Sequence, residues 1–186
     1  MYDKSQVYAP AEDTFLLRDA ALAEVLPEDT VLEVGTGSGE VAAAVAPHAR
    51  STIACDINPH AVAYAREVHG LTVIESDLFS AIDGTFSLIL FNAPYLPTAP
   101  EERMDDWLEY ALDGGIDGRA SIAKFLPQAY AHLTDGGRIL LLISSLTGLD
   151  AVIKMAEKEG LSAAVAASER EEDGEYLYVL RLVKIQ

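Results

Sequence analysis

Hydrophobic and polar positions along the chain follow two different periods. Residues 13–26 (DTFLLRDAALAEVL) repeat apolar positions at a helical spacing, whereas short apolar runs such as residues 30–35 (TVLEVG) are typical of buried strands. The pattern predicts helices over residues 13–26, 39–49, 59–70, 119–133 and 149–160. It predicts strands over residues 30–35, 51–56, 71–77, 86–92, 136–144, 161–171 and 174–184. Pro and Gly residues interrupt both periods between 96 and 118, so we expect a long irregular segment there.

This order of elements predicts the fold class. Strands that alternate with helices form a parallel, doubly wound α/β sheet with both faces covered, and the last two strands are expected to pair as an antiparallel hairpin. Residues 1–186 are enough for one domain with a sizeable core. Such sheets bind ligands beyond the carboxyl ends of their strands. The residues expected at those ends are the glycine-rich segment Gly35–Gly39 and the polar residues Asp56, Asp77 and Asn92.

A glycine-rich loop lies between the first predicted strand and the next helix, at residues 32–42 (LEVGTGSGEVA). Gly35, Gly37 and Gly39 lack a Cβ, which allows a sharp turn and the close approach of a ligand. Asp56 ends the following strand, where a carboxylate can accept both hydroxyls of a ribose. The loop and Asp56 together indicate a cofactor that contains a nucleoside.

Two cofactors fit these residues. The loop matches the weak dinucleotide pattern G-x-G-x-x-A at residues 37–42, so a nicotinamide cofactor is one alternative. Glu33 precedes the loop, and an anion there suits a cation better than a pyrophosphate. S-adenosylmethionine carries a sulfonium and an ammonium and no phosphate, and is the cofactor that we expect. Asp77 would then accept from the adenine amino group, and the backbone of Leu78 would contact the ring.

The fourth predicted strand ends in Asn92-Ala93-Pro94-Tyr95. An amide or base nitrogen is a poor nucleophile because its lone pair is delocalised, but a site that accepts both N–H hydrogens can aim it at a methyl donor. Asn92 offers a side-chain oxygen for one hydrogen, and the Ala93 carbonyl offers the second acceptor. Pro94 stiffens the turn, and Tyr95 offers a face for a planar group. The simpler interpretation is a turn that ends a strand.

Composition narrows the choice of partners and location. Thirty acidic and 13 basic residues give a net charge of −17, which disfavours nucleic-acid binding and suggests the salt-adapted cytoplasm of a halophilic archaeon. No apolar run is long enough for a membrane span, and no secretory signal pattern occurs at the N-terminus. Cys55 is the only cysteine, and the four histidines lack a zinc-ligand spacing, so we expect neither a disulfide nor a metal site.

Several motifs together resemble one family, the HemK-type protein glutamine methyltransferases. NAPY looks like the [N/D/S]-P-P-[Y/F/W] signature of enzymes that methylate a planar nitrogen. The matching segments are VYAPAEDTFLL (7–17), LEVGTGSG (32–39), DINPHA (56–61), NAPY (92–95) and GGIDGR (114–119). The chain is most similar to the short archaeal and eukaryotic branch, which lacks a separate N-terminal helical domain. Ala93 departs from the signature, which usually has proline there.

The resemblance implies a fold, an activity and a set of residues. The fold is a Rossmann-like class I S-adenosylmethionine-dependent methyltransferase with a seven-stranded, mostly parallel sheet, in which helix 13–26 caps the cofactor site. The activity is N5-methylation of the glutamine in the Gly-Gly-Gln motif of a class 1 translation release factor. Asn92 to Tyr95 would hold the glutamine amide. The cofactor contacts would be Thr14, Glu33, Gly35, Gly37, Gly39, Asp56, Asp77, Leu78 and Asn92.

The expected partners follow from the same branch. Glu101, Glu102 and Trp107, in the irregular segment, are candidates for contacting the substrate. Members of the branch pair with a small zinc-binding activator subunit, so we expect a heterodimer. Residues 71–75 should form an edge strand of the sheet, and an apolar edge can accept a strand from another chain.

Two other functions compete with glutamine methylation. An N6-adenine nucleic-acid methyltransferase can use a similar tetrapeptide for the same chemical reason, but the acidic charge and the lack of a target-recognition domain disfavour it. A non-catalytic subunit with the methyltransferase fold is the third hypothesis. Asn92 and the glycine loop are both intact, which disfavours that hypothesis.

Overall fold

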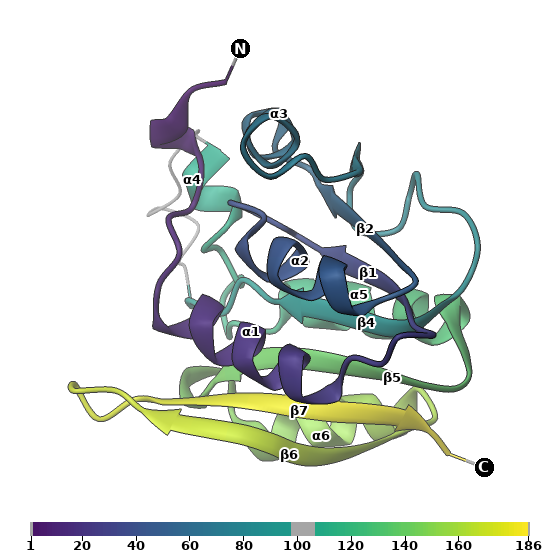
Figure 1. The fold of residues 1–186 in the computed structure, drawn as a ribbon. Helices are drawn as coiled ribbons and strands as arrows, with labels where there is room; N and C mark the ends of the chain where they lie inside the picture. The colour runs from purple at the N-terminus through teal and green to yellow at the C-terminus, as the bar shows by residue number, and fades with distance from the viewer. Residues whose placement is uncertain (1, 98–106, 186) are drawn as a thin grey trace.

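The computed structural model describes residues 2–97 and 107–185 and has a single mixed sheet at its centre (Figure 1). Within these residues the sheet has seven strands in the order β3-β2-β1-β4-β5-β7-β6. The parallel strands are β1 (Thr30–Val34), β2 (Ser51–Asp56), β3 (Val73–Glu75), β4 (Phe86–Asn92) and β5 (Leu133–Ser144). The antiparallel hairpin at the other edge consists of β6 (Leu161–Arg170) and β7 (Tyr176–Lys184). The predicted α/β fold class is confirmed.

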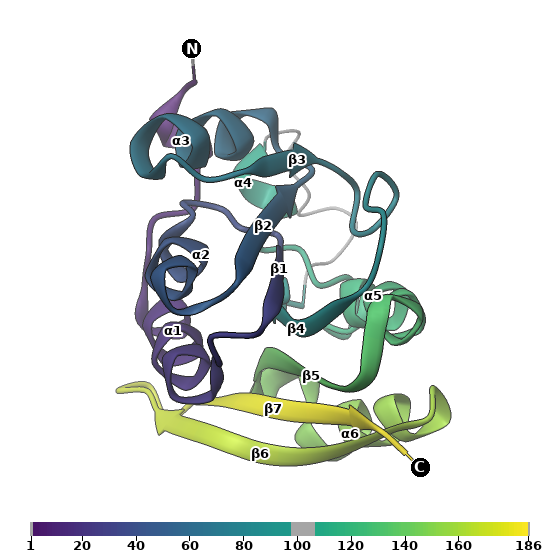
Figure 2. The ribbon, with the colours of Figure 1, turned by 45° about the vertical axis from the view of Figure 1, so that its right-hand side comes forward.

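Helices cover both faces of the sheet (Figure 2). One face carries α1 (Glu12–Glu24), α2 (Glu40–Val45) and α3 (Pro59–His69). The opposite face carries α5 (Ala120–His132) and α6 (Leu149–Lys158). A short helix, α4 (Trp107–Tyr110), lies inside the segment that we expected to be irregular. None of the helices in the described part of the chain combines the length and the apolar character needed to cross a bilayer.

Local chemistry explains where the elements begin and end. Helix α3 starts as predicted, because the Asn58 side chain accepts from the His60 N–H at 2.9 Å and Pro59 occupies the first turn. Helix α1 stops two residues before the predicted position, since Val25 is extended and the Leu26 N–H donates to Asp29 instead. Helix α2 is also shorter than predicted, and its last turn becomes the 3₁₀-helix η2 (Ala46–His48).

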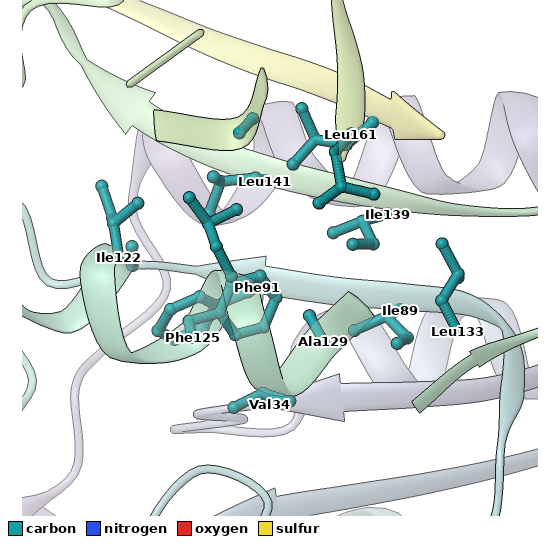
Figure 3. Close-up of a cluster of buried hydrophobic side chains, with 14 of the residues drawn as sticks. Val34, Ile89, Phe91, Ile122, Phe125, Ala129, Leu133, Ile139, Leu141 and Leu161 are labelled. Atoms are coloured by element: carbon teal, nitrogen blue, oxygen red, sulfur yellow. The ribbon is translucent and has the colours of Figure 1, made fainter. Parts of the chain in front are cut away.

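Hydrophobic side chains fill the space between the sheet and each helical layer. Phe91 on β4 packs against Phe125 on α5 with ring centroids 4.5 Å apart, and both rings are buried (Figure 3). On the other face, Leu17 of α1 is fully buried in a cluster that includes Leu88 and Leu90. The central strand β4 is therefore covered on both faces, and Asn92 stands at the end of a buried strand.

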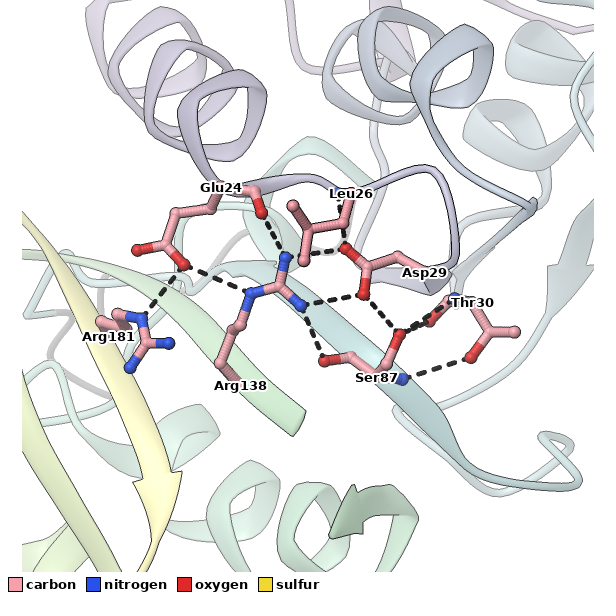
Figure 4. A network of polar contacts seen from close by, with 7 residues as sticks. All are labelled: Glu24, Leu26, Asp29, Thr30, Ser87, Arg138 and Arg181. Atoms are coloured by element: carbon pink, nitrogen blue, oxygen red, sulfur yellow. Dashed lines mark hydrogen bonds and ion pairs between the residues drawn. The ribbon is translucent and has the colours of Figure 1, made fainter. Parts of the chain in front are cut away.

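A buried polar network ties the amino-terminal end of the sheet together (Figure 4). Arg138 on β5 donates to both carboxylate oxygens of Asp29, at 2.9 and 2.7 Å, and to Glu24 at 3.2 Å. Ser87 donates to Asp29 at 2.7 Å. Burial alone would raise the pKa of Asp29, but the hydrogen bonds from Arg138 and Ser87 lower it to about 2. This network joins α1, β4 and β5 at the end of the sheet away from Asn92.

We predict that Arg138→Met lowers the free energy of unfolding by about 3–5 kcal/mol at pH 7, because it strands a buried carboxylate. The folded pKa of Asp29, about 2, lies below its ordinary value of 3.8. Its contribution to stability is therefore complete above about pH 4 and is lost as the pH falls toward 2. Urea denaturation at several pH values measures both effects.

Arg181→Met is the matched control, because Arg181 pairs with the same Glu24 at 3.0 Å but has a side chain that is 39% exposed. We expect a loss of less than about 1 kcal/mol for this variant. Equal losses for the two arginines would show that the buried pair is not the feature that stabilises this end of the sheet.

Candidate active site

A cavity of about 360 Å³ lies at the carboxyl ends of β1, β2 and β4. Strands β1 and β4 are neighbours, and the helices that follow them lie on opposite faces, so the cavity sits at the switch point of the sheet. The N-terminal segment and the loop after β4 complete its wall. The lining residues that matter for the chemistry are Tyr8, Gly35, Gly37, Asp56, Asp77, Leu78, Asn92, Pro94, Trp107 and Lys124.

The glycine loop divides into a part that faces the cavity and a part that packs inward. Gly35 and Gly37 line the cavity, and both have a positive φ. Gly39 does not occur among the described lining residues. A Cβ on Gly39 would lie 2.8 Å from the Cβ of Ala65, so this glycine lets the loop pack closely on α3.

Glu33 supports the loop from inside the protein. Its side chain is buried and accepts hydrogen bonds from the Thr36 hydroxyl at 2.5 Å and from the Ala42 N–H at 3.0 Å. Burial raises the pKa of Glu33 to about 8, although these hydrogen bonds oppose the shift. Glu33 is not one of the described residues that line the cavity, and neither is Thr14, whose hydroxyl accepts from the Ala11 N–H at the start of α1.

Asp56 links the glycine loop to the end of β2. One carboxylate oxygen accepts from the Gly37 N–H and the other from the Asn58 N–H, each at 2.8 Å. Burial raises the pKa of Asp56, and the backbone hydrogen bonds partly oppose this shift. A carboxylate has about four acceptor positions. Asp56 can therefore hold the loop and still accept hydroxyl groups from a ligand in the cavity.

Leu78 adopts an unusual backbone conformation at the cavity wall. It is the only residue other than glycine with a positive φ, 48°, in the described ranges 2–97 and 107–185. Its carbonyl accepts from the Ser76 hydroxyl at 2.9 Å and from the Cys55 thiol at 3.4 Å. Strained residues of this kind gather at ligand sites. Asp77, next to it, is exposed and also lines the cavity.

Asn92 ends β4 in the wall shared by this cavity and a second, much smaller one of about 20 Å³. Its Nδ2 donates to Asp13 Oδ2 at 2.9 Å. Its Oδ1 is buried and has no hydrogen-bond partner among the described residues. A buried acceptor without a partner is costly in a stable protein, and its usual explanation is a ligand or water that completes it.

The three residues after Asn92 are divided between the two cavities. Ala93 is 1% exposed and lines it together with Tyr95. Pro94 lines the large cavity, and its carbonyl accepts from the Ser121 hydroxyl at 3.1 Å. Burial, and then the nearby carboxylate of Asp13, raise the pKa of the Tyr95 hydroxyl well above its ordinary value. Tyr95 is therefore a neutral phenol that lines the same small cavity as Asn92.

The structure describes one of the three residues in the predicted irregular segment that were expected to contact the substrate. Trp107 lines the large cavity, and its backbone N–H donates to Gln6 Oε1 at 3.1 Å. Glu101 and Glu102 lie outside the described residues. No group of His, Cys, Asp or Glu that could hold a metal ion occurs in the parts of the chain that the structure describes.

Comparison with known proteins assigns this geometry to a family. Residues 31–113 match a family model described as a methyltransferase domain. A Methanocaldococcus jannaschii protein is 40% identical over 168 residues, covering 87% of this chain and 84% of the relative. That relative is named provisionally as a protein N5-glutamine methyltransferase. The chain belongs to the protein N5-glutamine methyltransferase family.

Two other proteins support this family assignment. The mouse methyltransferase HEMK2 is 37% identical over 193 residues, covering 96% of this chain and 90% of that protein. The structure of the E. cuniculi Mtq2–Trm112 complex, described as responsible for methylation of the translation termination factor eRF1, aligns with a TM-score of 0.79 at 27% identity. That alignment covers 96% of this chain and 99% of the other. The resemblance seen in the motifs is confirmed.

The cavity of the methyltransferase fits S-adenosylmethionine, the methyl donor of this family. Its volume suits a ligand of nucleoside size. Three aspartates, Asp56, Asp77 and Asp113, line it, against one cation, Lys124, in the described part of the wall. A wall of this charge suits a sulfonium and an ammonium better than the phosphates of a dinucleotide.

Two residues that the sequence motifs did not predict as functional, Asp13 and Tyr8, form a chain of hydrogen bonds with Asn92 in the methyltransferase. Asp13 is buried and contacts the amide, and the Tyr8 hydroxyl donates to both oxygens of Asp13, at 3.3 and 3.2 Å. Both residues belong to the segment VYAPAEDTFLL, in which the prediction singled out only Thr14. The separation of 79 positions between Asp13 and Asn92 hides their contact from any local pattern.

We predict that Glu33→Gln removes a pH dependence from the stability of the protein. The folded pKa of Glu33, about 8, lies above its ordinary value of 4.5. Its favourable contribution is therefore present below about pH 4.5 and is lost as the pH rises toward 8, by up to about 1.4 kcal/mol per pH unit. The introduced glutamine stays neutral and keeps an oxygen acceptor, so the unfolding free energy of the variant should fall less over this range.

Urea denaturation between pH 5 and 8.5 measures the difference, with the exposed Glu28→Gln as the matched control. The control should keep the slope of the wild type. Parallel slopes for Glu33→Gln and the wild type would mean that Glu33 is ionised in the folded protein throughout.

Proposed function

We propose that this methyltransferase transfers a methyl group to the side-chain nitrogen of the glutamine in the Gly-Gly-Gln motif of a class 1 translation release factor. The family assignment gives the reaction, and the relatives named above give the class of substrate. One observation carries the proposal at the site. It is the buried, unpartnered Oδ1 of Asn92, a residue that lines the cofactor cavity.

The reaction needs a planar NH₂ group held in one orientation. In the proposed complex the glutamine nitrogen donates one hydrogen to Asn92 Oδ1 and the other to the Ala93 carbonyl. Fixing the nitrogen in a dry site can lower the barrier by up to about 7–11 kcal/mol in favourable cases. Acceptors placed on the two N–H groups also stabilise the positive charge that develops on the nitrogen. Tyr95 would stack against the amide plane.

The cofactor-binding roles follow the lining of the large cavity. S-adenosylmethionine, when bound, supplies the electrophilic methyl group. We propose that Asp56 accepts the ribose hydroxyls, that Asp77 accepts from the adenine amino group, and that Leu78 contacts the ring. Gly35 and Gly37 would leave room for the ligand. Glu33, Thr14 and Gly39 contribute indirectly in this proposal, by holding the loop and the start of α1 in place.

The small cavity, at about 20 Å³, is too small for a glutamine side chain. We therefore propose that substrate binding enlarges it. Trp107, Glu101 and Glu102 stay candidates for contacts with the chain around the glutamine. In one domain built from residues 1–186, α1 would cap the site from the side of Asp13.

We also propose a heterodimer with a small zinc-binding activator subunit along the edge strand β3. β3 is the outermost strand at this end of the sheet, and the similar Mtq2 protein was solved as a complex with Trm112. The Arg66 guanidinium donates to the Val73 carbonyl of β3, so one acceptor of this edge is already in use. An added strand would replace that hydrogen bond or pair beside it.

Mass spectrometry of the release factor, after incubation with the protein and S-adenosylmethionine, tests the proposed substrate. We expect one methyl group on the glutamine of Gly-Gly-Gln. No label should appear when that glutamine is replaced, because the planar NH₂ group is then lost. Each reaction is run with the protein alone and with the activator co-expressed.

The same assay includes bare DNA and RNA as acceptors. Label on nucleic acid but not on the release factor would overturn the proposed substrate in favour of adenine methylation. Full activity and solubility of the isolated chain would remove the need for the activator, whereas dependence on co-expression would support it.

We further propose the cytoplasm of a halophilic archaeon as the location, on the basis of the net charge of −17. Repulsion between surface carboxylates destabilises the compact state, and salt screens it. The melting temperature should therefore rise steeply between dilute buffer and molar KCl. A melting temperature that is high in dilute buffer and unchanged by KCl would contradict the proposal.

A further inference from the structure

The amide of Asn92 can occupy two orientations of almost equal shape. Its oxygen and its nitrogen are nearly the same size, so packing alone does not choose between them. Only the orientation with the oxygen toward the substrate can accept an N–H hydrogen. The opposite orientation would present two more hydrogens to an NH₂ group and would block the reaction. Some other group must therefore select the orientation.

Asp13 is placed to make that selection. Its Oδ2 lies 2.9 Å from Asn92 Nδ2, and an ionised carboxylate can only accept hydrogen bonds. If the amide turned over, the Asn92 oxygen would face the Asp13 oxygen with no hydrogen between them. Two oxygen acceptors at that separation repel each other. The correct orientation therefore gains a charge-assisted hydrogen bond, and the opposite orientation is destabilised by this repulsion.

Asp13 is itself held by donors. The Thr14 N–H donates to Asp13 Oδ1 at 2.6 Å, and the Tyr8 hydroxyl reaches both oxygens. Asp13 also lies in the first turn of α1, where the positive end of the helix dipole favours a carboxylate. The groups that contact its two oxygens are hydrogen-bond donors, and Asp13 is only 4% exposed. The carboxylate is thus built into the start of the helix.

We infer that Asp13 is a positioning residue that acts through Asn92, by keeping the amide oxygen directed toward the nitrogen to be methylated. The hydrogen bond to a carboxylate also polarises the amide and makes Oδ1 a stronger acceptor. The inference rests on the proposed function, since it requires an NH₂ substrate. It adds a residue whose role is distinct from the two acceptors that contact the substrate.

Asp13→Asn tests this role because the hydrogen bonds at position 13 determine the orientation of the new side-chain amide. The Thr14 N–H, fixed in the helix, requires an oxygen at the Oδ1 position. The new NH₂ group then occupies the Oδ2 position and faces Asn92, which turns over to accept from it. We expect kcat to fall about 100-fold, with cofactor affinity and melting temperature near those of the wild type.

The reciprocal exchange separates positioning from a structural role. Asn92→Asp alone places two carboxylates at hydrogen-bond distance and should also lose activity. In the double variant Asp13→Asn/Asn92→Asp, the new amide donates to one oxygen of the new carboxylate, and the other oxygen of that carboxylate faces the substrate. The double variant should therefore be at least about 10-fold more active than Asn92→Asp, a non-additive result. Direct contact of Asp13 with the substrate predicts no such recovery, and a purely structural role predicts a recovery of activity only in step with the melting temperature.

The matched control is Asp150→Asn, because Asp150 occupies the same second position of a helix, α6, but is exposed and far in sequence from the site. Its kcat should equal that of the wild type. Unchanged kcat in Asp13→Asn, or a double variant no better than Asn92→Asp, would overturn the inference. The second comparison stands even where Asp13→Asn fails to fold.

A substrate-independent readout distinguishes failure of this inference from failure of the proposed function. In ¹⁵N-labelled protein, the side-chain NH₂ signal that disappears in Asn92→Asp belongs to Asn92. That signal should shift in Asp13→Asn and stay in place in Asp150→Asn. A wild type that leaves the release factor unmodified would contradict the proposed substrate, and the NH₂ signal would still decide the role of Asp13. A signal that Asp13→Asn leaves unchanged would overturn that role.

Discussion

The hydrogen bond between Asn92 Nδ2 and Asp13 Oδ2 is the interaction on which the proposed chemistry of this site depends. It joins the end of the central strand β4 to the first turn of α1, and it leaves the amide oxygen buried without a partner in the described structure. A site that must accept hydrogens from a weakly nucleophilic NH₂ group needs such an oxygen, fixed before the substrate arrives. In the proposed mechanism, the rest of the fold holds these two groups in place.

The sheet provides that rigidity from two directions. β4 is covered on both faces by hydrophobic clusters, so Asn92 is presented by a deeply buried strand. At the opposite end of the strands, Arg138 of β5 donates to Glu24 at the end of α1 and to the Ser87 carbonyl of β4. The Arg138–Glu24 pair and the hydrogen bond between Asp13 and Asn92 thus constrain the two ends of α1. The glycine loop, supported by Glu33, borders the cofactor cavity on the neighbouring strand.

Much of this arrangement could be predicted from the sequence, because its signals are local. Hydrophobic periods indicated the order of strands and helices, and the polar residues that end two of the strands, Asp56 and Asn92, identified the edge of the sheet that carries the cavity. Other features depend on contacts between distant segments. The pairing of Asp13 with Asn92 and the inward position of Glu33 arise only when the chain is folded. The positive φ of Leu78, whose carbonyl accepts a hydrogen bond from Ser76, could not be predicted from the residue type, because leucine rarely adopts this conformation.

A crystal structure of the protein with S-adenosylhomocysteine and a Gly-Gly-Gln segment of the release factor tests the central claim most directly. We predict that the glutamine nitrogen lies within hydrogen-bond distance, about 2.7–3.2 Å, of both Asn92 Oδ1 and the Ala93 carbonyl oxygen. Asp13 should still accept from Asn92 Nδ2 in that complex. A glutamine nitrogen that contacts neither oxygen, with the Asn92 side chain turned away from it, would contradict the claim.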